Sequence, residues 1–255
     1  MDNHFILTPF FFDRYDEGLA DLSEDHWVIN RPDLPSGNEI HRTMAVHRPL
    51  VDLTMRAIKN GERPVSIAGD CCAAIPVMAG LQQAGIHPAF LWVDAHGDFN
   101  TWDTTPSGFL GGMPLAMMVG LGERTLGDHV GLEKIPEKHI VLTDGRDLDP
   151  GERQLIEASE VVHLPDIMDL LNFNPPKREL YIHFDTDILD PSDAPAMGYL
   201  ASGGPPPETL EQIFHHLANT YDLVALSMST WRPSMDTDGR SQAVCMRLLN
   251  ALIGQ

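Results

Sequence analysis

A run of metal-capable side chains directly after an apolar strand constrains this chain more than any other feature. Residues 90–93 (Phe-Leu-Trp-Val) are typical of a buried strand, and Asp94, His96 and Asp98 follow within five residues. Strand side chains alternate between faces, so an extended backbone would direct these three side chains the same way. Such a set can chelate one divalent ion or be shared between two. The alternative is a polar loop that caps the strand, with Asp98 and Asn100 as turn residues.

Two further predicted strands end in residues of the same chemistry. The apolar residues 180–184 lead into Asp185 and Asp187, and residues 64–68 lead into the sequence Gly-Asp-Cys-Cys at 69–72. In an open parallel α/β sheet, binding sites form at the carboxyl ends of the strands. We therefore expect the three stretches to converge on one site, which three independent turns would not do.

The rest of the chain predicts an α/β fold. Strands alternate with amphipathic helices, a pattern that favours a doubly wound, mainly parallel sheet with helices on both faces. The length of 255 residues suits one domain spanning 1–255. Besides a buried first strand near the N-terminus and an irregular segment at 13–42, we expect strands at 64–68, 90–93, 139–143, 161–164, 180–184 and 223–228, and helices at 43–60, 72–84, 113–121, 151–158, 165–172 and 241–253.

The net charge and the number of cysteines limit which binding partners and which cellular compartment we expect for this chain. The chain has 17 basic and 37 acidic residues, a formal charge of −20, which disfavours nucleic acids and anionic membranes as partners. No segment offers the roughly 18 uninterrupted apolar residues of a membrane span, and the N-terminus lacks the basic region of a signal peptide. Three cysteines do not make a disulfide framework in a chain this long, so we expect a reducing, cytoplasmic setting.

Two long blocks of this sequence resemble the signatures of the ureohydrolase superfamily (arginase, agmatinase and relatives). Residues 94–114 match its Asp-Ala-His-x-Asp-x-Asn-Thr block, which runs on to Ser-Gly-x-x-x-Gly-x-Pro, and residues 184–191 match Phe-Asp-x-Asp-x-x-Asp-Pro. The resemblance implies an arginase-like three-layer α/β/α fold. It also implies two manganese ions, hydrolysis of carbon–nitrogen bonds in small guanidino or amidino compounds, and a homo-oligomer, either a trimer or a hexamer.

The predicted metal site contains four carboxylates that must lie close together. Asp94, Asp98, Asp185 and Asp187 would repel one another unless cations neutralised them. The resemblance makes Asp94 and Asp185 bridging ligands, lets His96 and Asp187 complete one metal, and assigns Asp98 to the other. A hydroxide that bridges two divalent ions is a nucleophile available near neutral pH. Asp98 is also a candidate catalytic residue.

Cys71 departs from the family pattern, which has a histidine ligand at this position. A thiolate is a softer ligand that favours zinc or iron over manganese. Manganese remains the expected metal, with Zn²⁺, Fe²⁺ or Ni²⁺ as alternatives because of Cys71. The other interpretation is that Cys71 is a buried apolar residue beside a weakly held metal.

Further departures fall in the predicted substrate region. Gly111 stands where the family has a histidine thought to shuttle protons, and Phe109 replaces an asparagine that contacts the substrate. Asn100 and Ser107 remain as polar substrate contacts. His183, two residues before Asp185, is a second candidate catalytic residue. Its alternative is a structural histidine satisfied within a strand.

Thr230 occupies the position of a family glutamate that holds the substrate guanidinium. Losing a carboxylate there favours a less basic amidine, such as an N-hydroxyguanidine. The sequence is therefore similar to a divergent branch that resembles N-hydroxyarginine hydrolases with cysteine in the metal site. We predict a metal-dependent hydrolase of a small linear amidine or guanidino compound. The alternatives are an arginase-like pseudoenzyme or binding protein, and a hydrolase of formimino groups.

Overall fold

The computed structural model describes residues 1–229 and 231–254, and it is built around one parallel sheet. Its eight strands are hydrogen-bonded in the order β4-β1-β5-β10-β9-β6-β7-β8, with every pairing between them parallel. The bounds are β1 Asn3–Thr8, β4 Val28–Ile29, β5 Arg63–Ala68, β6 Ala89–Asp94, β7 Ile140–Asp144, β8 Val162–Leu164, β9 Glu179–Asp185 and β10 Asp222–Ser229. A short antiparallel pair, β2 (Phe10–Phe11) and β3 (Arg14–Tyr15), lies outside this sheet. The predicted α/β fold class is confirmed.

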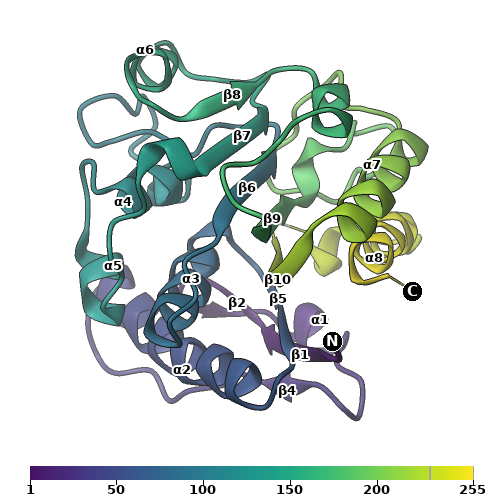
Figure 1. The fold of residues 1–255 in the computed structure, drawn as a ribbon. Helices are drawn as coiled ribbons and strands as arrows, with labels where there is room; N and C mark the ends of the chain where they lie inside the picture. Colours follow the sequence, from purple (N-terminus) through teal and green to yellow (C-terminus); the bar gives the residue numbers. More distant parts are fainter. Residues whose placement is uncertain (230, 255) are drawn as a thin grey trace.

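Helices cover both faces of the sheet, as Figure 1 shows for α2 and α3 on one side and α7 and α8 on the other. The α-helices are α1 Glu17–Ala20, α2 Glu39–Lys59, α3 Ala74–Gln83, α4 Pro114–Val119, α5 Thr125–Val130, α6 Pro150–Ala158, α7 Pro207–Thr220 and α8 Arg240–Ile253. The short 3₁₀ helices are η1 Cys71–Ala73, η2 Leu110–Gly112, η3 Glu137–His139, η4 Ile167–Leu171, η5 Thr186–Ile188 and η6 Pro233–Met235.

Strand β6 illustrates why two layers of helices form. Its residues are all buried, and they alternate between two apolar cores: Phe90 and Trp92 pack with α2 and α3, whereas Leu91 and Val93 pack with α7 and α8. A strand that is apolar on both faces needs cover on both, which is the pattern of a central strand in a parallel sheet. Within the described residues, no helix combines the length and apolar character needed to cross a membrane.

Some predicted boundaries differ from the structure. Helix α2 begins before the expected residue 43, because the side chain of Asn38 caps it by accepting a hydrogen bond from the backbone N–H of His41. The expected helix at 165–172 is the short 3₁₀ helix η4. The segment 13–42 is not wholly irregular, since it contains β3, α1, β4 and the start of α2.

The order of the central strands decides where the site lies. Strands β5, β10, β9 and β6 are consecutive neighbours. Parallel strands end at the same edge, so residues that follow β5, β9 and β6 meet there although they are far apart in sequence.

Candidate metal centre

Three strand ends supply the buried groups of the site. Asp94 is the last residue of β6, Asp185 is the last residue of β9, and Cys71 opens η1 just after β5. All three side chains are buried. The sulfur of Cys71 lies 2.6 Å from Oδ2 of Asp185, to which the thiol donates a hydrogen bond. The predicted convergence of the strand ends is therefore present.

The loop after β6 departs from the extended backbone that the sequence suggested. The strand ends at Asp94, whose Oδ1 accepts a hydrogen bond of 2.7 Å from the backbone N–H of His96. Asp98 then adopts a left-handed backbone with φ of 48°, a conformation that aspartate tolerates better than most residues. The condition of the sequence argument, an extended backbone through these residues, is therefore not met, and a turn places Asp98 and His96 in different groups around Asp94.

Three overlapping groups of side chains have the composition of metal sites. One contains Cys71, Asp94 and Asp98, and a second contains Asp94, His96 and Asp187; the ligand atoms within each lie within 4.8 Å of one another. Asp94 belongs to both, which is the arrangement expected of a bridging carboxylate. A third group joins Cys71 and Asp185 with His183.

Two carboxylate oxygens in this cluster lack a hydrogen-bond partner. Oδ2 of Asp98 and Oδ1 of Asp187 are buried and accept no hydrogen bond from the part of the chain that the structure describes. Buried acceptors are normally satisfied, so an orphaned pair of this kind requires an explanation such as a bound ion. Hard oxygen ligands together with imidazole and one thiolate suit a divalent cation. The residues present therefore fit a metal centre.

Electrostatics point the same way. Burial, followed by the charges of Asp94 and Asp185, raises the pKa of Asp98 well above its ordinary value. Burial and the charge of Asp94 raise the pKa of Asp187 to about 7. Burial and the neighbouring charge of Asp185 also raise the pKa of Cys71. Ionising these groups together would place more negative charge here than the protein neutralises, and a bound cation would favour their ionised forms.

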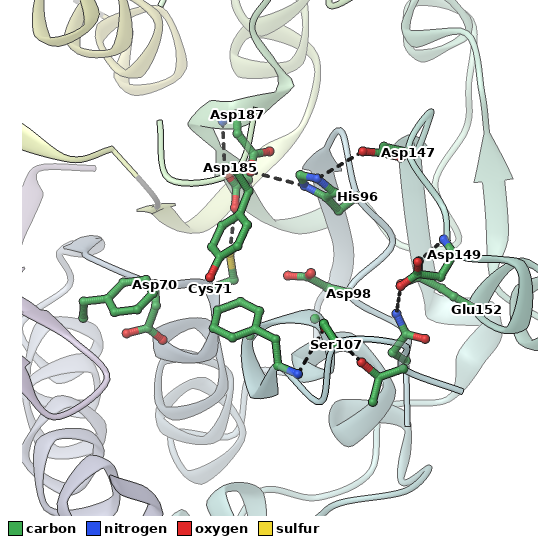
Figure 2. Close-up of a pocket in the computed structure, with 17 residues that line it drawn as sticks. Asp70, Cys71, His96, Asp98, Ser107, Asp147, Asp149, Glu152, Asp185 and Asp187 are labelled. Carbon is green, nitrogen blue, oxygen red and sulfur yellow. Dashed lines mark hydrogen bonds and ion pairs between the residues drawn. The ribbon is translucent and has the colours of Figure 1, made fainter. Parts of the chain in front are cut away.

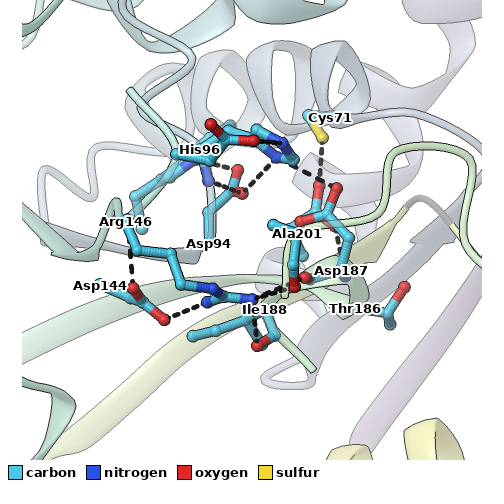
Figure 3. Close-up of polar contacts among 12 residues, drawn as sticks. Cys71, Asp94, His96, Asp144, Arg146, Thr186, Asp187, Ile188 and Ala201 are labelled. Carbon is cyan, nitrogen blue, oxygen red and sulfur yellow. Dashed lines mark hydrogen bonds and ion pairs between the residues drawn. The ribbon is translucent and has the colours of Figure 1, made fainter. Parts of the chain in front are cut away.

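His96 partly balances this charge. Its Nδ1 lies 3.2 Å from Asp187 Oδ2 and its Nε2 lies 3.8 Å from Asp147 Oδ2 (Figure 2). Nδ1 also lies 3.4 Å from Asp94 Oδ1 (Figure 3). Burial disfavours the imidazolium, but the hydrogen bonds and charges of Asp187 and Asp94 outweigh it and raise the pKa of His96. The protonated ring therefore balances part of the charge of Asp94 and Asp187. The neutral ring would instead be available to bind a cation.

His183 lies behind the centre instead of facing the cavity. It is 1% exposed, stacks on Trp92 at a centroid distance of 4.0 Å, and contacts the hydroxyls of Ser227 and Ser229. Burial lowers its pKa to about 3, so the ring is neutral. A role for His183 as a general acid or base stays a prediction.

A cavity of about 380 Å³ opens over the centre. Three of the predicted substrate residues, Asn100, Ser107 and Phe109, line it. The fourth, Thr230, lies outside the described residues. Five of the six predicted metal-ligand residues line it as well: Cys71, His96, Asp98, Asp185 and Asp187 (Figure 2). Among the described residues that line the cavity, none is lysine or arginine.

Sequence reasoning missed four acids of the cavity wall: Asp70, Asp147, Asp149 and Glu152. Asp70 follows β5 and the other three follow β7, so the strand-end rule applied to the first three strands would have found them. Asp149 and Glu152 form a capping box at the start of α6, and Asn100 Nδ2 donates to Asp149 Oδ2 at 3.0 Å. Glu152 also accepts a hydrogen bond from the backbone N–H of Phe99, and burial raises its pKa to about 7.

The two departures at 109 and 111 are linked in space. A Cβ atom added to Gly111 would lie 2.3 Å and 2.5 Å from the ring atoms Cε1 and Cζ of Phe109. The ring also packs edge-on against Phe12, at a centroid distance of 5.7 Å, and in a tilted arrangement against Tyr199, at 4.9 Å. Phe109 thus occupies the space that any side chain at 111 would need.

Arg146 ties together the loops around the centre, as Figure 3 shows. Its guanidinium pairs with Asp144 and donates to the backbone carbonyls of Ile188 and Ala201 at 3.0 Å and 2.9 Å. Its Nε donates to the carbonyl of Ser202 at 3.1 Å. One side chain after β7 therefore fixes η5, which carries Asp187, and the loop that follows it.

The fold and the site define a parallel α/β protein with clustered metal-ligand groups at the carboxyl edge of its sheet. The chain belongs to the arginase family, whose model matches residues 15–254. An arginase of Bacillus caldovelox is 30% identical over 213 residues, which cover 78% of this chain and 71% of that protein. An N(omega)-hydroxy-L-arginine amidinohydrolase of Streptomyces lavendulae is 28% identical over 236 residues, covering 90% and 79%. The crystal structure of arginase from Bacillus subtilis shares the fold, with a TM-score of 0.84 at 24% identity over 100% of this chain and 99% of that chain.

Proposed function

We propose that this protein is a metal-dependent hydrolase that cleaves a carbon–nitrogen bond in a small linear amidine or guanidino compound. The observation that carries the proposal is the shared carboxylate of Asp94, which joins two ligand groups beneath a cavity, with orphaned oxygens of Asp98 and Asp187 beside it. Membership of the arginase family supports the same reaction class.

Six side chains are proposed to hold two divalent ions: Cys71, Asp94, His96, Asp98, Asp185 and Asp187. Manganese is the proposed metal, and the thiol of Cys71 keeps zinc, iron or nickel as alternatives. When bound, the ions would supply a nucleophile for hydrolysis by lowering the pKa of a coordinated water. Asp98, which lines the cavity, is the proposed acid–base residue of this chain.

The residues that line the cavity favour a substrate with a cationic or strongly polar planar group. Asp147, Asp149 and Glu152 face the same space as the metal-ligand groups, and the described lining contains no lysine or arginine to oppose them. Asn100 and Ser107 offer neutral hydrogen-bonding groups. An N-hydroxyguanidino group is the proposed finer assignment, supported by the similarity to a hydroxyarginine amidinohydrolase and by the cysteine in the ligand cluster.

We also propose a cytoplasmic homo-oligomer that binds neither nucleic acid nor membrane. The negative charge of −20 and the three buried free cysteines support this setting. Sedimentation velocity with and without manganese would give the number of subunits and would distinguish a trimer or hexamer from a monomer.

The test begins with metal content. The protein is purified anaerobically, loaded with manganese and dialysed, and the bound metal is counted per chain. We expect two ions per chain, and turnover of arginine or N-hydroxyarginine measured as release of urea or hydroxyurea, with a formimino compound included in the panel. Asp94→Ala should lose both metal and turnover, whereas Asp128→Ala, which changes an exposed acid that does not line the cavity, should keep both.

The outcomes separate the alternatives. Faster turnover of N-hydroxyarginine than of arginine supports the N-hydroxyguanidino assignment, and the reverse order refutes it. Preferential turnover of the formimino compound would replace the guanidino substrate. One ion or none, with no turnover of any compound, would refute the hydrolase and leave a pseudoenzyme or binding protein.

A further inference from the structure

A chain of buried hydroxyls and one imidazole runs from the sulfur of Cys71 into the sheet. Ser229 Oγ donates to Cys71 Sγ at 3.3 Å, and the same hydroxyl lies 3.2 Å from His183 Nε2. On the other side of the ring, His183 Nδ1 lies 2.8 Å from Ser227 Oγ, which is 2.8 Å from the hydroxyl of Tyr181. All of these side chains are buried.

Strand register creates this chain. Strands β9 and β10 are parallel neighbours in which His183 pairs with Ser227 and Asp185 pairs with Ser229. Residues two apart on a strand share a face, so Tyr181 and His183 point the same way, as do Ser227 and Ser229. Asp185 and Ser229, the last residues of the two strands, both contact the sulfur of Cys71, the first residue of η1. The polar residues are therefore stacked in a line that leads to the sulfur.

The direction of the hydrogen bonds follows from donor accounting. The hydroxyl of Ser229 has one proton, which is directed at the sulfur, so its oxygen accepts from His183 Nε2–H. A neutral imidazole then has Nδ1 as an acceptor, which receives the proton of the Ser227 hydroxyl. Both nitrogens are engaged by hydroxyls, and the ring does not line the cavity. This arrangement makes His183 a supporting residue behind the ligands.

We propose that Ser229, oriented by His183, is a positioning residue that holds the Cys71 sulfur toward the metal-ligand carboxylates and stabilises it as a ligand. This inference rests on the proposed metal-dependent function. A donor aimed at a ligating sulfur orients it and stabilises its negative charge, as outer partners do for other metal ligands. Asp94 and Asp98 lie near the sulfur in one group of potential ligands, and Asp185 accepts its hydrogen bond. The sulfur thus contacts one fixed donor as well as a cluster of acids.

The test uses cobalt in place of the native metal, because a thiolate bound to Co²⁺ gives a ligand-to-metal charge-transfer absorption that oxygen and nitrogen ligands do not. The full-length protein is titrated with Co²⁺ under anaerobic conditions, and the near-ultraviolet band and the cobalt affinity are recorded. Cys71→Ser should abolish the band. Ser229→Ala should keep the band but shift it, and should weaken cobalt binding by roughly 10- to 100-fold.

A matched control removes a different buried hydroxyl from the same region. Ser66 lies on β5, opposite Ser227 in the strand register, and its hydroxyl has no hydrogen-bond partner among the described residues. Ser66→Ala should leave the band and the cobalt affinity unchanged. His183→Leu removes the donor behind Ser229 and should shift the band in the same direction as Ser229→Ala, whereas His183→Gln, which keeps an N–H donor, should restore it in part. Thermal unfolding of each metal-free variant checks that it is folded.

The possible failures are distinguishable. If the unmodified protein binds no cobalt, the proposed function and this inference are both overturned. If cobalt binds but Cys71→Ser changes neither the band nor the affinity, the sulfur is not a ligand and the inference is overturned alone. The same holds if Ser229→Ala and His183→Leu both bind cobalt with the band and affinity of the unmodified protein. If Ser229→Ala does not fold, the His183 pair gives the decision.

Discussion

Phe109 and Gly111 should behave as one coupled unit when they are substituted. A Cβ at 111 would approach the Phe109 ring to 2.3 Å, whereas carbon atoms in contact normally lie about 3.5–4.0 Å apart. The ring would therefore have to move by more than an ångström, against Phe12 and Tyr199, which pack on it. Overpacking of this kind typically costs about 1–3 kcal/mol of unfolding free energy.

The sign of the effect should reverse when the ring is removed. Gly111 does not adopt a left-handed backbone and lies in the 3₁₀ helix η2. Replacing a glycine by alanine at such a compatible position stabilises a protein by about 0.4–1 kcal/mol through the unfolded state. Gly111→Ala should thus destabilise the unmodified protein but be neutral or stabilising in a Phe109→Ala background.

A double-mutant cycle measures this coupling directly. Urea unfolding of the four proteins gives the interaction free energy, and EDTA in every sample keeps the metal content constant. In thermal unfolding, Gly111→Ala should lower the Tm by roughly 2–12 °C only when Phe109 is present. Equal effects of Gly111→Ala in both backgrounds would refute the steric argument. Gly112→Ala is the matched control, because a Cβ there meets no atom closer than 3.9 Å.

Three further predictions concern charge at the centre and around it. Asp98→Asn should raise the Tm in EDTA, because it removes a buried carboxylate that neighbouring carboxylates repel. The same variant should lose the stabilisation of about 2.7 kcal/mol that metal at 100 times its Kd gives the unmodified protein. Thermal unfolding with and without manganese measures both effects. Burial raises the pKa of Glu152 from 4.5 to about 7, so this group contributes stability that is present below pH 4.5 and is lost as the pH rises to 7. Glu152→Gln should flatten this decline in unfolding free energy, measured by urea unfolding of the metal-free protein. An identical pH slope in the two proteins would contradict the argument. Arg146→Met should lower the unfolding free energy by roughly 2–3 kcal/mol, because Asp144 and several carbonyls lose their donor, and a loss within 0.5 kcal/mol by urea unfolding would contradict this.

The strand ends could be predicted from sequence, and the loops between them could not. Asp94 and Asp185 were placed by a local rule, since an apolar run followed by an acid marks the carboxyl end of a parallel strand. The position of Asp98 was not predictable from alternation, because a left-handed turn intervenes. Asp149 and Glu152 were missed because this part of the sequence was interpreted only through the helix expected at 151–158. In the structure they cap α6 and also line the cavity.

Contacts across strands were beyond sequence reasoning for a different reason. His183 and Ser229 are 46 residues apart, and their meeting depends on the register between β9 and β10. A shift of one residue would turn every side chain of a strand to the opposite face. The sequence offered two interpretations of His183, catalytic or structural, and only the register shows that both of its ring nitrogens face serine hydroxyls behind the ligand cluster.

Two of the departures from the family pattern, Phe109 and Gly111, are matched in space, and this bears on whether the site still functions. Phe109 fills the space that Gly111 leaves, and the sulfur of Cys71, a third departure, accepts a hydrogen bond from Ser229. A site losing its function without compensation would leave cavities or unsupported polar groups where side chains had changed. Here Phe109 and Gly111 contact each other, and the buried oxygens of Asp98 and Asp187 that lack hydrogen-bond partners among the described residues lie among the metal-ligand groups. This arrangement agrees with the proposed metal-dependent function, and the metal count and substrate panel described above test it.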